Sequence, residues 1–479
     1  MKSIGQNILL SVIRKSCHIL FPLLIFPYVS RVLGPEGYGT FSYANSLISY
    51  FLMAAMLGIS TYAVREGTRI RDDKENLEKF LNEVSTINLL SLVVVSIVMY
   101  VFIALNRGMA KDREILLVLS VILPATFLGR DWINTIFEDY LYITVRYIVI
   151  QIIGLFAIFV FVREETDCLT YTIIYMLTVT VGYAVNLFYT RRYVKFRLTC
   201  KLQLRKHIVP IMIIFGGQAA TNIYIQSDIT LIGVFQSESE VGIYAVASKI
   251  YVLVKDIVGT ITTVVIPRLV YYLGKQDDTR FRIFTNKLYN YLLIMVIPLM
   301  VGVFFLSKEF LWLVGGKEYI GGEEALKILS IALVFAVFAG FYCNAVLVPK
   351  RKEKEYLIIT VIAAIVNIVL NCCFVPYIGI MGAAVTTLIS EIVVFVMGLK
   401  KTKSILSVQI SAHSIVTIII GSIAVAAVCM LSKLLFDGCV WRVIFGVSVS
   451  AIMYLIILIL LKNEVAMSII KRTHIDAKE

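Results

Sequence analysis

Charged residues are scarce in this sequence, and their scarcity excludes most soluble folds. Only 16% of the 479 residues are Asp, Glu, Lys or Arg, whereas 59% are hydrophobic and the mean hydropathy is +0.87. Soluble domains carry about 25% charged residues and about 45–50% apolar residues. The composition therefore predicts one polytopic membrane domain in place of several soluble domains.

The usual motifs of metal, disulfide and nucleotide chemistry are also missing. The eight cysteines form no C-x-x-C pair, and the four histidines form no H-E-x-x-H motif. The sequence has no phosphate-binding Gly-Lys-Ser/Thr loop, so any transport is expected to be secondary. We predict no structural disulfide, no metal site, no cofactor and no enzymatic activity.

Fourteen apolar stretches fill most of the chain, and each is about as long as the ~20 residues that cross a bilayer core. The connections between them are too short to fold into a soluble domain. Arg14, Lys15 and His18 interrupt the first stretch, so it is expected to insert as a helix and not to act as a cleavable signal. The stretches are 8–30, 40–62, 84–106, 114–136, 142–162, 169–190, 208–233, 242–267, 288–307, 325–348, 357–375, 382–399, 411–435 and 443–461.

Lysine and arginine are concentrated on alternate connections. The N-terminal tail, every second loop and the C-terminal tail together hold 29 of the 45 basic residues. Basic residues near span ends stay in the cytoplasm. We therefore predict a multi-pass membrane protein with both termini in the cytoplasm. The net charge of +13 then reflects topology and lipid headgroups, and no nucleic-acid partner is expected.

A weak internal repeat relates the two halves. Residues 34–46 (GPEGYGTFSYANS) and 237–249 (SESEVGIYAVASK) align at an offset of 203, which pairs Gly39 with Gly242. Each copy lies between the first two helices of a six-helix set, so both sets start on the same side of the membrane. The predicted fold is all-α: two six-helix bundles related by a pseudo-two-fold axis along the membrane normal, plus two C-terminal helices. The predicted parts are 1–206, 207–403 and 404–479.

Polar residues recur on one face of the first two predicted helices of each repeat, at spacings of three and four residues. Such side chains are costly against lipid, so they are expected to face a central cavity. Buried cations outnumber anions there, which predicts an anionic cargo. The pattern assigns substrate binding to Arg14, Lys15, His18, Asn45, Gln218, Asn222, Tyr244, Lys249, Tyr251 and Lys255, and a coupling ion to Asp228, Asp256 or Glu391.

Structural explanations stay open for some of these residues. Arg14 or Lys15 could extend to the cytoplasmic interface, and Asp228 or Glu391 could be a satisfied buried acid. A separate group near the end of the fourth predicted helix is better explained as a structural salt-bridge cluster. Its members are Asp131, Asn134 and Glu138, with Arg130 and Arg146 nearby.

Three segments carry a resemblance to a known family. They are FPYVSRVLGPEGYGTFSYANSLISYF at 26–51, the stretch 131–151 and the stretch 227–250. Together they resemble the bacterial polysaccharide repeat-unit (O-antigen-type) flippases, whose superfamily also contains multidrug exporters and the peptidoglycan-precursor flippase. The resemblance implies two six-helix bundles around a central cavity. It also adds Arg31, just after the first helix, to the candidate substrate contacts.

The resemblance implies a secondary transporter of the bacterial inner membrane that moves an undecaprenyl-diphosphate-linked oligosaccharide from the inner to the outer leaflet by alternating access. Arg14, Arg31, Lys249 and Lys255 would pair with the diphosphate. The expected partners are this substrate, membrane lipids, a polysaccharide polymerase and glycosyltransferases, and the expected state is a monomer.

Three other functions stay open at this point. A peptidoglycan-precursor flippase would use similar chemistry. A multidrug antiporter of the same fold would need an acidic cavity for cationic drugs. A membrane-embedded polymerase or glycosyltransferase would need a large loop with paired carboxylates, and no connection in this chain is long enough for a catalytic domain.

Overall fold

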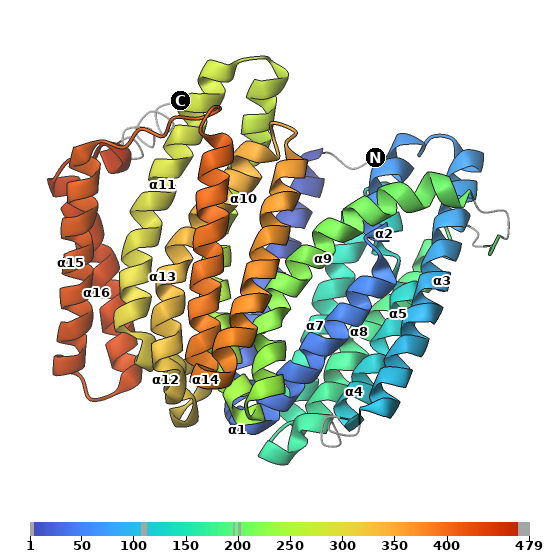
Figure 1. Cartoon of the computed structure of the whole chain (residues 1–479), viewed down its shortest axis with the longest axis horizontal. Helices are drawn as coiled ribbons and strands as arrows, with labels where there is room; N and C mark the ends of the chain where they lie inside the picture. The colour runs from blue at the N-terminus through green and yellow to red at the C-terminus, as the bar shows by residue number, and fades with distance from the viewer. Residues whose placement is uncertain (1–3, 107–112, 195–196, 200–202, 468–479) are drawn as a thin grey trace. The chain divides into compact units, whose positions relative to one another are not determined.

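The computed structural model describes residues 4–106, 113–194, 197–199 and 203–467, and every regular element within these ranges is a helix (Figure 1). Twelve helices of this part are long and apolar enough to cross a membrane. Many of their Leu, Ile, Val and Phe side chains are exposed, as expected for surfaces that face lipid. The predicted all-α polytopic fold is confirmed.

Two of the helices each cover more than one of the fourteen predicted stretches, one of which, 40–62, runs past the end of its helix at Met56. α1 (Ile4–Met56) is helical through the predicted loop at 31–39 except at Gly34, whose φ is 65°. α14 (Glu353–Thr402) departs from helical geometry at Ile378 and Gly379, and the φ of Gly379 is 54°. Glycine adopts positive φ without a clash at Cβ. Each of these elements therefore consists of two helices that meet at a kink, as the two predicted stretches require, but the connection is one or two residues long and not an open loop.

The fourth predicted stretch, 114–136, is divided into three short helices. These are α4 (Arg113–Ser120), α5 (Ile122–Gly129) and α6 (Asp131–Ile136). The break between α5 and α6 falls on Arg130, whose φ of 38° is uncommon for a residue with a side chain.

Residues 1–242 form the first compact unit. α1 packs against α9, α7 and α3, and α8 packs against α5 and α7. The short helix α2 begins after Gly58, which has a φ of 71°, and buries Tyr62 in a cluster with Phe80 and Trp132. The remaining helices of this unit are α2 (Ile59–Arg69), α3 (Lys74–Leu105), α7 (Tyr140–Phe161), the 3-10 turn η2 (Glu165–Asp167), α8 (Cys168–Thr190) and α9 (Leu204–Phe235).

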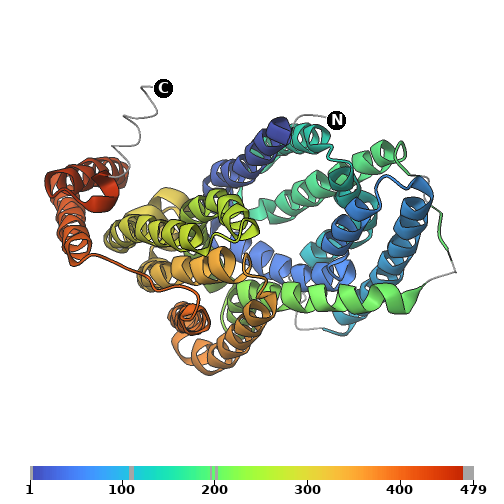
Figure 2. The ribbon, with the colours of Figure 1, turned by 90° about the horizontal axis from the view of Figure 1, so that it is seen from above.

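Residues 243–479 form the second unit, and α10 (Glu238–Gly274) enters it from the first. α13 packs against α14 and α11, while α15 packs against α16 and α11. An extended segment joins α14 to α15 (Figure 2). The predicted boundaries at 206 and 403 stay predictions. The other elements are α11 (Asp278–Phe305), α12 (Ser307–Gly315), the 3-10 turn η3 (Lys317–Gly322), α13 (Glu323–Gly340), the π-helical turn η4 (Phe341–Leu347), α15 (Ala412–Leu435) and α16 (Cys439–Leu460).

The two segments of the sequence repeat touch within the first unit. A Cβ added at Gly39 would overlap the carbonyl oxygen of Glu238, and one added at Gly242 would overlap the carbonyl oxygen of Pro35. The offset of 203 relates Pro35 to Glu238 as it relates Gly39 to Gly242. The contact is therefore reciprocal, as at a two-fold axis. Both glycines are required for the close approach of the two backbones.

A buried carboxylate holds the C-terminal helix pair to the rest of the second unit. The side chain of Glu309, on α12, is 1% exposed and lies 3.3 Å from Lys433 Nζ of α15 and 3.5 Å from Arg442 Nη1 of α16. The Tyr454 hydroxyl of α16 donates to the carbonyl oxygen of Ile294 at 2.7 Å. One acid and one phenol thus bind the pair to α12 and α11.

Replacing Glu309 by Ala is expected to lower the free energy of unfolding by about 1–3 kcal/mol, because two cations lose their shared partner. Thermal unfolding in detergent measures this effect. Limited trypsin cleavage at Lys403, in the segment before α15, should also become faster. The control is Glu318→Ala on the neighbouring η3 turn, where the side chain is exposed. Equal stability of the two variants would contradict the role of Glu309.

Candidate functional site

A polar seam runs between α1 and α9 in the first unit. The hydroxyls of Ser46 and Tyr50 lie 3.0 Å and 3.1 Å from Thr230 Oγ1, and Ser49 Oγ donates to Asn222 Oδ1 at 3.4 Å. These groups come from segments more than 170 residues apart in the chain. The seam therefore joins two of the polar stripes that the sequence predicted.

The predicted residues of α1 and α9 lie along or beside this seam. Gln218 Nε2 donates to Thr61 Oγ1 of α2 at 3.1 Å, and Asp228 is buried two residues before Thr230. Asn45 is half-buried next to Ser46. Gln218 is exposed, so the end of the seam near α2 is open while the end near Asp228 is enclosed.

The first turns of α1 place two further candidates. The His18 ring stacks on the Tyr147 ring of α7, with centroids 4.0 Å apart. Arg14 lies one turn earlier and is half-buried, and its Nε has no hydrogen-bond partner among the residues that the structure describes. The side chain of Lys15 lies outside the described part. Arg31 is exposed farther along the helix.

In the second unit, Tyr251, Lys255 and Glu391 converge. Tyr251 donates its hydroxyl to Glu391 Oε1 at 3.0 Å, and Lys255 Nζ lies 3.8 Å from the same oxygen. The Glu391 side chain is 7% exposed, whereas that of Lys255 is 31% exposed. The ammonium group also lies 5.1 Å from the centre of the Tyr251 ring. The lysine therefore neutralises a buried carboxylate while one of its faces stays accessible.

The other predicted residues of α10 differ in exposure. Tyr244 is 1% exposed, so its ring is part of the packed interior in this conformation. Lys249 is half-buried, and Asp256, two turns farther along, is exposed. The structure thus brings Tyr251 and Lys255 to Glu391 but leaves Asp256 at the surface. The assignment of all these residues to substrate or ion binding stays a prediction.

The predicted salt-bridge cluster near α6 is confirmed only for Asp131 and Arg146, because the Asn134 side chain has no hydrogen-bond partner among the described residues. Arg146 Nη2 lies 2.7 Å and 2.8 Å from the two oxygens of Asp131, and Asn186 donates to Asp131 Oδ1 at 2.9 Å. Glu138 pairs instead with Arg71 Nη1 at 2.8 Å. Arg71 was not among the expected partners, because it precedes α6 by about 60 residues in the sequence.

A buried triad of Tyr62, His207 and Glu83 was not predicted. His207 Nε2 lies 2.8 Å from Glu83 Oε2, and Tyr62 donates its hydroxyl to Nδ1 of the same ring at 2.8 Å when the proton is on Nε2. The side chains of His207 and Glu83 are 1% and 4% exposed. They come from α2, α3 and α9, and no sequence spacing relates them. The only signal in the sequence is that each of the three residues lies beside an apolar run, which could have indicated that it is buried.

Comparisons with known proteins match this architecture. Residues 4–272 match the family described as polysaccharide biosynthesis protein, and residues 214–373 match the MatE family. A putative O-antigen transporter from Shigella dysenteriae is 19% identical over 404 residues, covering 83% of this chain and all of the relative. A probable low-salt glycan biosynthesis flippase from Haloferax volcanii is 24% identical over 208 residues, 43% of each chain.

Solved structures share the fold. A lipid II flippase in an inward closed conformation superposes with a TM-score of 0.79 at 18% identity, covering 96% of this chain and 100% of that chain. An inward-facing multidrug resistance transporter of the MATE family has a TM-score of 0.59 at 15% identity, and the match covers 82% of this chain and 98% of that one. The predicted resemblance is confirmed. The match to the family described as polysaccharide biosynthesis protein spans more than half of this chain, so the chain belongs to that family.

Proposed function

We propose that this protein is a flippase that moves a lipid-linked oligosaccharide from the inner to the outer leaflet of the bacterial cytoplasmic membrane. The observation that carries the proposal is the match to an O-antigen transporter over that relative's whole length, in a chain with twelve candidate spans among its described residues. The relatives are transporters or flippases, which supports transport and not catalysis as the activity. The undecaprenyl-diphosphate carrier is the form of substrate that we expect.

A polar route is necessary because the headgroup carries charge and many hydroxyl groups. Their transfer through hydrocarbon without partners would cost several kcal/mol for each polar group. The acyl tail can remain in the bilayer during the movement. The α1–α9 seam supplies hydroxyl and amide groups of the kind that sugars accept as hydrogen-bond partners. Asn45, Gln218 and Asn222 are the residues that we assign to the oligosaccharide.

The diphosphate is assigned to cations on α1 and α10. Lys255 is paired with Glu391, whereas Arg14 Nε has no hydrogen-bond partner among the described residues. A diphosphate that approached Lys255 would compete with this carboxylate, and Tyr251 would hold Glu391 in place meanwhile. In this scheme Lys255 exchanges partners as the substrate enters and leaves, which makes binding reversible. Lys15 and His18 are assigned to the same anionic group.

The membrane potential supplies part of the driving force in this proposal. One elementary charge that crosses 100 mV gains about 2.3 kcal/mol. Two phosphate charges that move outward from a negative interior would therefore gain roughly 4–5 kcal/mol. The same field would return the empty cationic cavity to the inward-open state. Asp228, Asp256 and Glu391 remain candidates for a coupling ion that replaces or assists this field.

The test is export of surface polysaccharide in cells whose own flippase has been deleted. Arg14→Ala and Lys249→Ala are each expected to lower export about tenfold at equal protein level, since each removes one charged hydrogen bond worth about 1.5–3 kcal/mol. Lys354→Ala, at an exposed position near the start of α14, is the control. Wild-type export by both site variants would refute the phosphate contacts.

A peptidoglycan precursor is the second candidate substrate, because a lipid II flippase shares the fold over 96% of this chain. Both substrates present a diphosphate, so the cations alone do not separate them. Flipping assays in vesicles with each lipid-linked substrate distinguish the two. We expect the O-antigen-type lipid to move and the peptidoglycan precursor to remain in its leaflet. The opposite result would reassign the substrate.

A further inference from the structure

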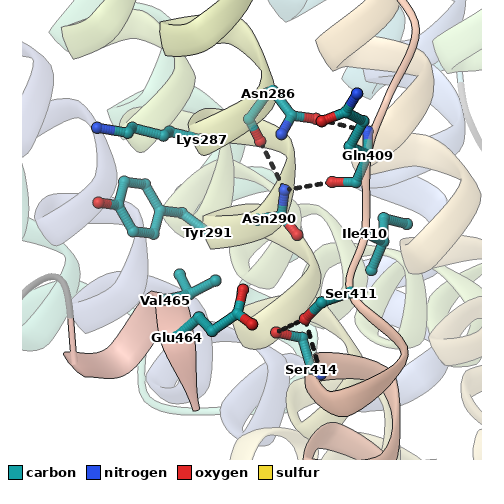
Figure 3. Close-up of a pocket in the computed structure, with 10 residues that line it drawn as sticks. All are labelled: Asn286, Lys287, Asn290, Tyr291, Gln409, Ile410, Ser411, Ser414, Glu464 and Val465. Atoms are coloured by element: carbon teal, nitrogen blue, oxygen red, sulfur yellow. Dashed lines mark hydrogen bonds between the residues drawn. The ribbon is translucent and has the colours of Figure 1, made fainter.

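A pocket of about 460 Å³ opens in the second unit, away from the residues assigned to the transported substrate (Figure 3). One side is formed by α11, with Asn286, Lys287, Asn290 and Tyr291. The other is formed by the segment before α15 and by the residues that follow α16. These contribute Gln409, Ser411 and Glu464, and the first turn of α15 adds Ser414.

The walls of the pocket are fixed by hydrogen bonds that leave its charges available. Asn286 Oδ1 accepts from the Gln409 amide at 2.8 Å, and Asn290 Nδ2 donates to the Gln409 carbonyl oxygen at 3.1 Å. Asn463 Oδ1 accepts from the amides of Val465 and Ala466 and so places Glu464 at the start of a helical turn. Asn463 Nδ2 also donates to Thr417 Oγ1 of α15, so the chain after α16 is held in place as the extended segment is.

Lys287 and Glu464 present opposite charges to this space. Within the described ranges neither side chain forms an ion pair, although Lys287 Nζ lies 5.7 Å from the centre of the Phe284 ring. In Figure 3 the ammonium group of Lys287 and the carboxylate of Glu464 are drawn apart, and no interaction joins them. An occupant that uses both charges must therefore carry an anionic and a cationic group at separate positions.

The ends of two apolar helices fix the depth of the pocket in the membrane. α15 has 24 residues and begins at Ala412, directly after Ser411. Its length of about 36 Å, at about 1.5 Å per residue, slightly exceeds the ~30 Å hydrocarbon core. α16 ends at Leu460, four residues before Glu464. The pocket therefore lies at the level of the lipid headgroups.

A smaller cavity of about 140 Å³ shares Lys287 and Tyr291 with the first one. It adds a second cation, Arg268, whose guanidinium carbon lies 4.4 Å from the centre of the Phe284 ring and whose Nε donates to the Tyr272 hydroxyl at 3.2 Å. Val265 and Leu288 give this cavity an apolar wall. Basic and apolar groups therefore meet on the Lys287 side of the pocket. A phospholipid needs the same two kinds of group where its phosphate joins the glycerol backbone.

We propose that this pocket binds the headgroup of an amine-bearing phospholipid, with the phosphate at Lys287 and Arg268 and the ammonium group at Glu464. The chemical class is phosphoethanolamine on a diacylglycerol. The bound headgroup bridges α11, the segment before α15 and the chain after α16. It therefore stabilises the attachment of the C-terminal helices. The site does not depend on which lipid-linked sugar the protein transports.

The test is native mass spectrometry of the full-length, delipidated protein titrated with phosphatidylethanolamine, phosphatidylcholine or phosphatidylglycerol of equal acyl length. Phosphatidylethanolamine is expected to bind about fivefold more tightly than phosphatidylglycerol, the ratio that one part-exposed ion pair provides. Glu464→Gln should remove this preference and leave the binding of phosphatidylglycerol unchanged or stronger. Lys287→Ala should weaken the binding of both phosphatidylethanolamine and phosphatidylglycerol. Phosphatidylcholine should bind more weakly than phosphatidylethanolamine, because its methylated amine cannot donate hydrogen bonds to Glu464.

Lys403→Ala is the matched control, because Lys403 is exposed near the same end of the unit but does not line the pocket. This variant should bind all three lipids as the wild type does. Equal affinity of the wild type for the three lipids would overturn the proposal, as would an equal loss in Lys403→Ala. Soluble phosphoethanolamine is expected to bind much more weakly than the lipid. If it binds equally well, the site recognises a free metabolite and the lipid assignment fails.

Discussion

Substitution of Gly39 by Ala is expected to abolish the folded protein, although it adds one methyl group. The added Cβ would overlap the carbonyl oxygen of Glu238 and lie 2.9 Å from the amide nitrogen of Gly242. Both obstacles are backbone atoms, so no side-chain rotation can relieve them. Overpacking in a close-packed interior costs about 1–3 kcal/mol even where neighbours can move, and we expect a cost at or above this range.

The measurement is the yield of monodisperse protein by size-exclusion chromatography in detergent, followed by thermal unfolding. Gly242→Ala should cause a similar loss, because the contact is reciprocal. The control is Gly259→Ala on α10, where a new Cβ meets no atom within 4 Å. Alanine favours a helix over glycine by about 1 kcal/mol, so the control should match or exceed the wild type. A stable Gly39→Ala variant would show that the two backbones can separate without penalty.

Replacement of His207 by Ala is expected to lower the free energy of unfolding by about 3–5 kcal/mol, since it leaves the Glu83 carboxylate buried without its partner. The Tyr62 hydroxyl loses its acceptor in the same variant. Apolar side chains that include Ile59, Leu81 and Ile211 surround these groups, so little water can replace the lost contacts.

Chemical or thermal unfolding of the purified variant measures this loss. His413→Ala is the matched control: Nε2 of His413 lies 2.7 Å from the Leu461 carbonyl oxygen, but the contact is exposed. It should cost about 1 kcal/mol or less. A second substitution, Glu83→Leu, should recover part of the stability of His207→Ala, because it removes the buried charge. If the double variant is less stable than the single one, Glu83 is stabilised by groups other than His207.

The fold could be predicted because membrane insertion depends on properties that are local in sequence. A run of about 20 apolar residues defines a span, and the distribution of lysine and arginine defines which loops share a side. The backbone geometry at the helix breaks could not be predicted in this way. Gly34 and Gly379 each join two helices at a kink where the sequence predicted a longer connection, and Arg130 adopts a positive φ inside a stretch predicted as one span. Whether a glycine bends a helix or packs within it depends on tertiary neighbours that the local sequence does not specify.

The candidate site was predictable only along single helices. The spacing of Tyr251 and Lys255 placed them on one face of a helix, and both indeed contact the same partner. That partner, Glu391, is 140 residues away from Tyr251, and no periodicity connects the two. The triad of Tyr62, His207 and Glu83 was missed for the same reason. Periodicity identifies the face that a residue occupies, whereas ion pairs depend on which faces meet.

The attachment of α15 and α16 has an evolutionary consequence. Their partners on α11 include Ile294, Ile297, Val301 and Phe305, which are as compatible with acyl chains as with another helix. If an ancestral transporter lost or gained this pair, the exposed surface would require almost no redesign. The exception is Glu309, which would lose both of its cations, Lys433 and Arg442. Loss or gain of the two C-terminal helices would therefore require a compensating change at this one buried acid.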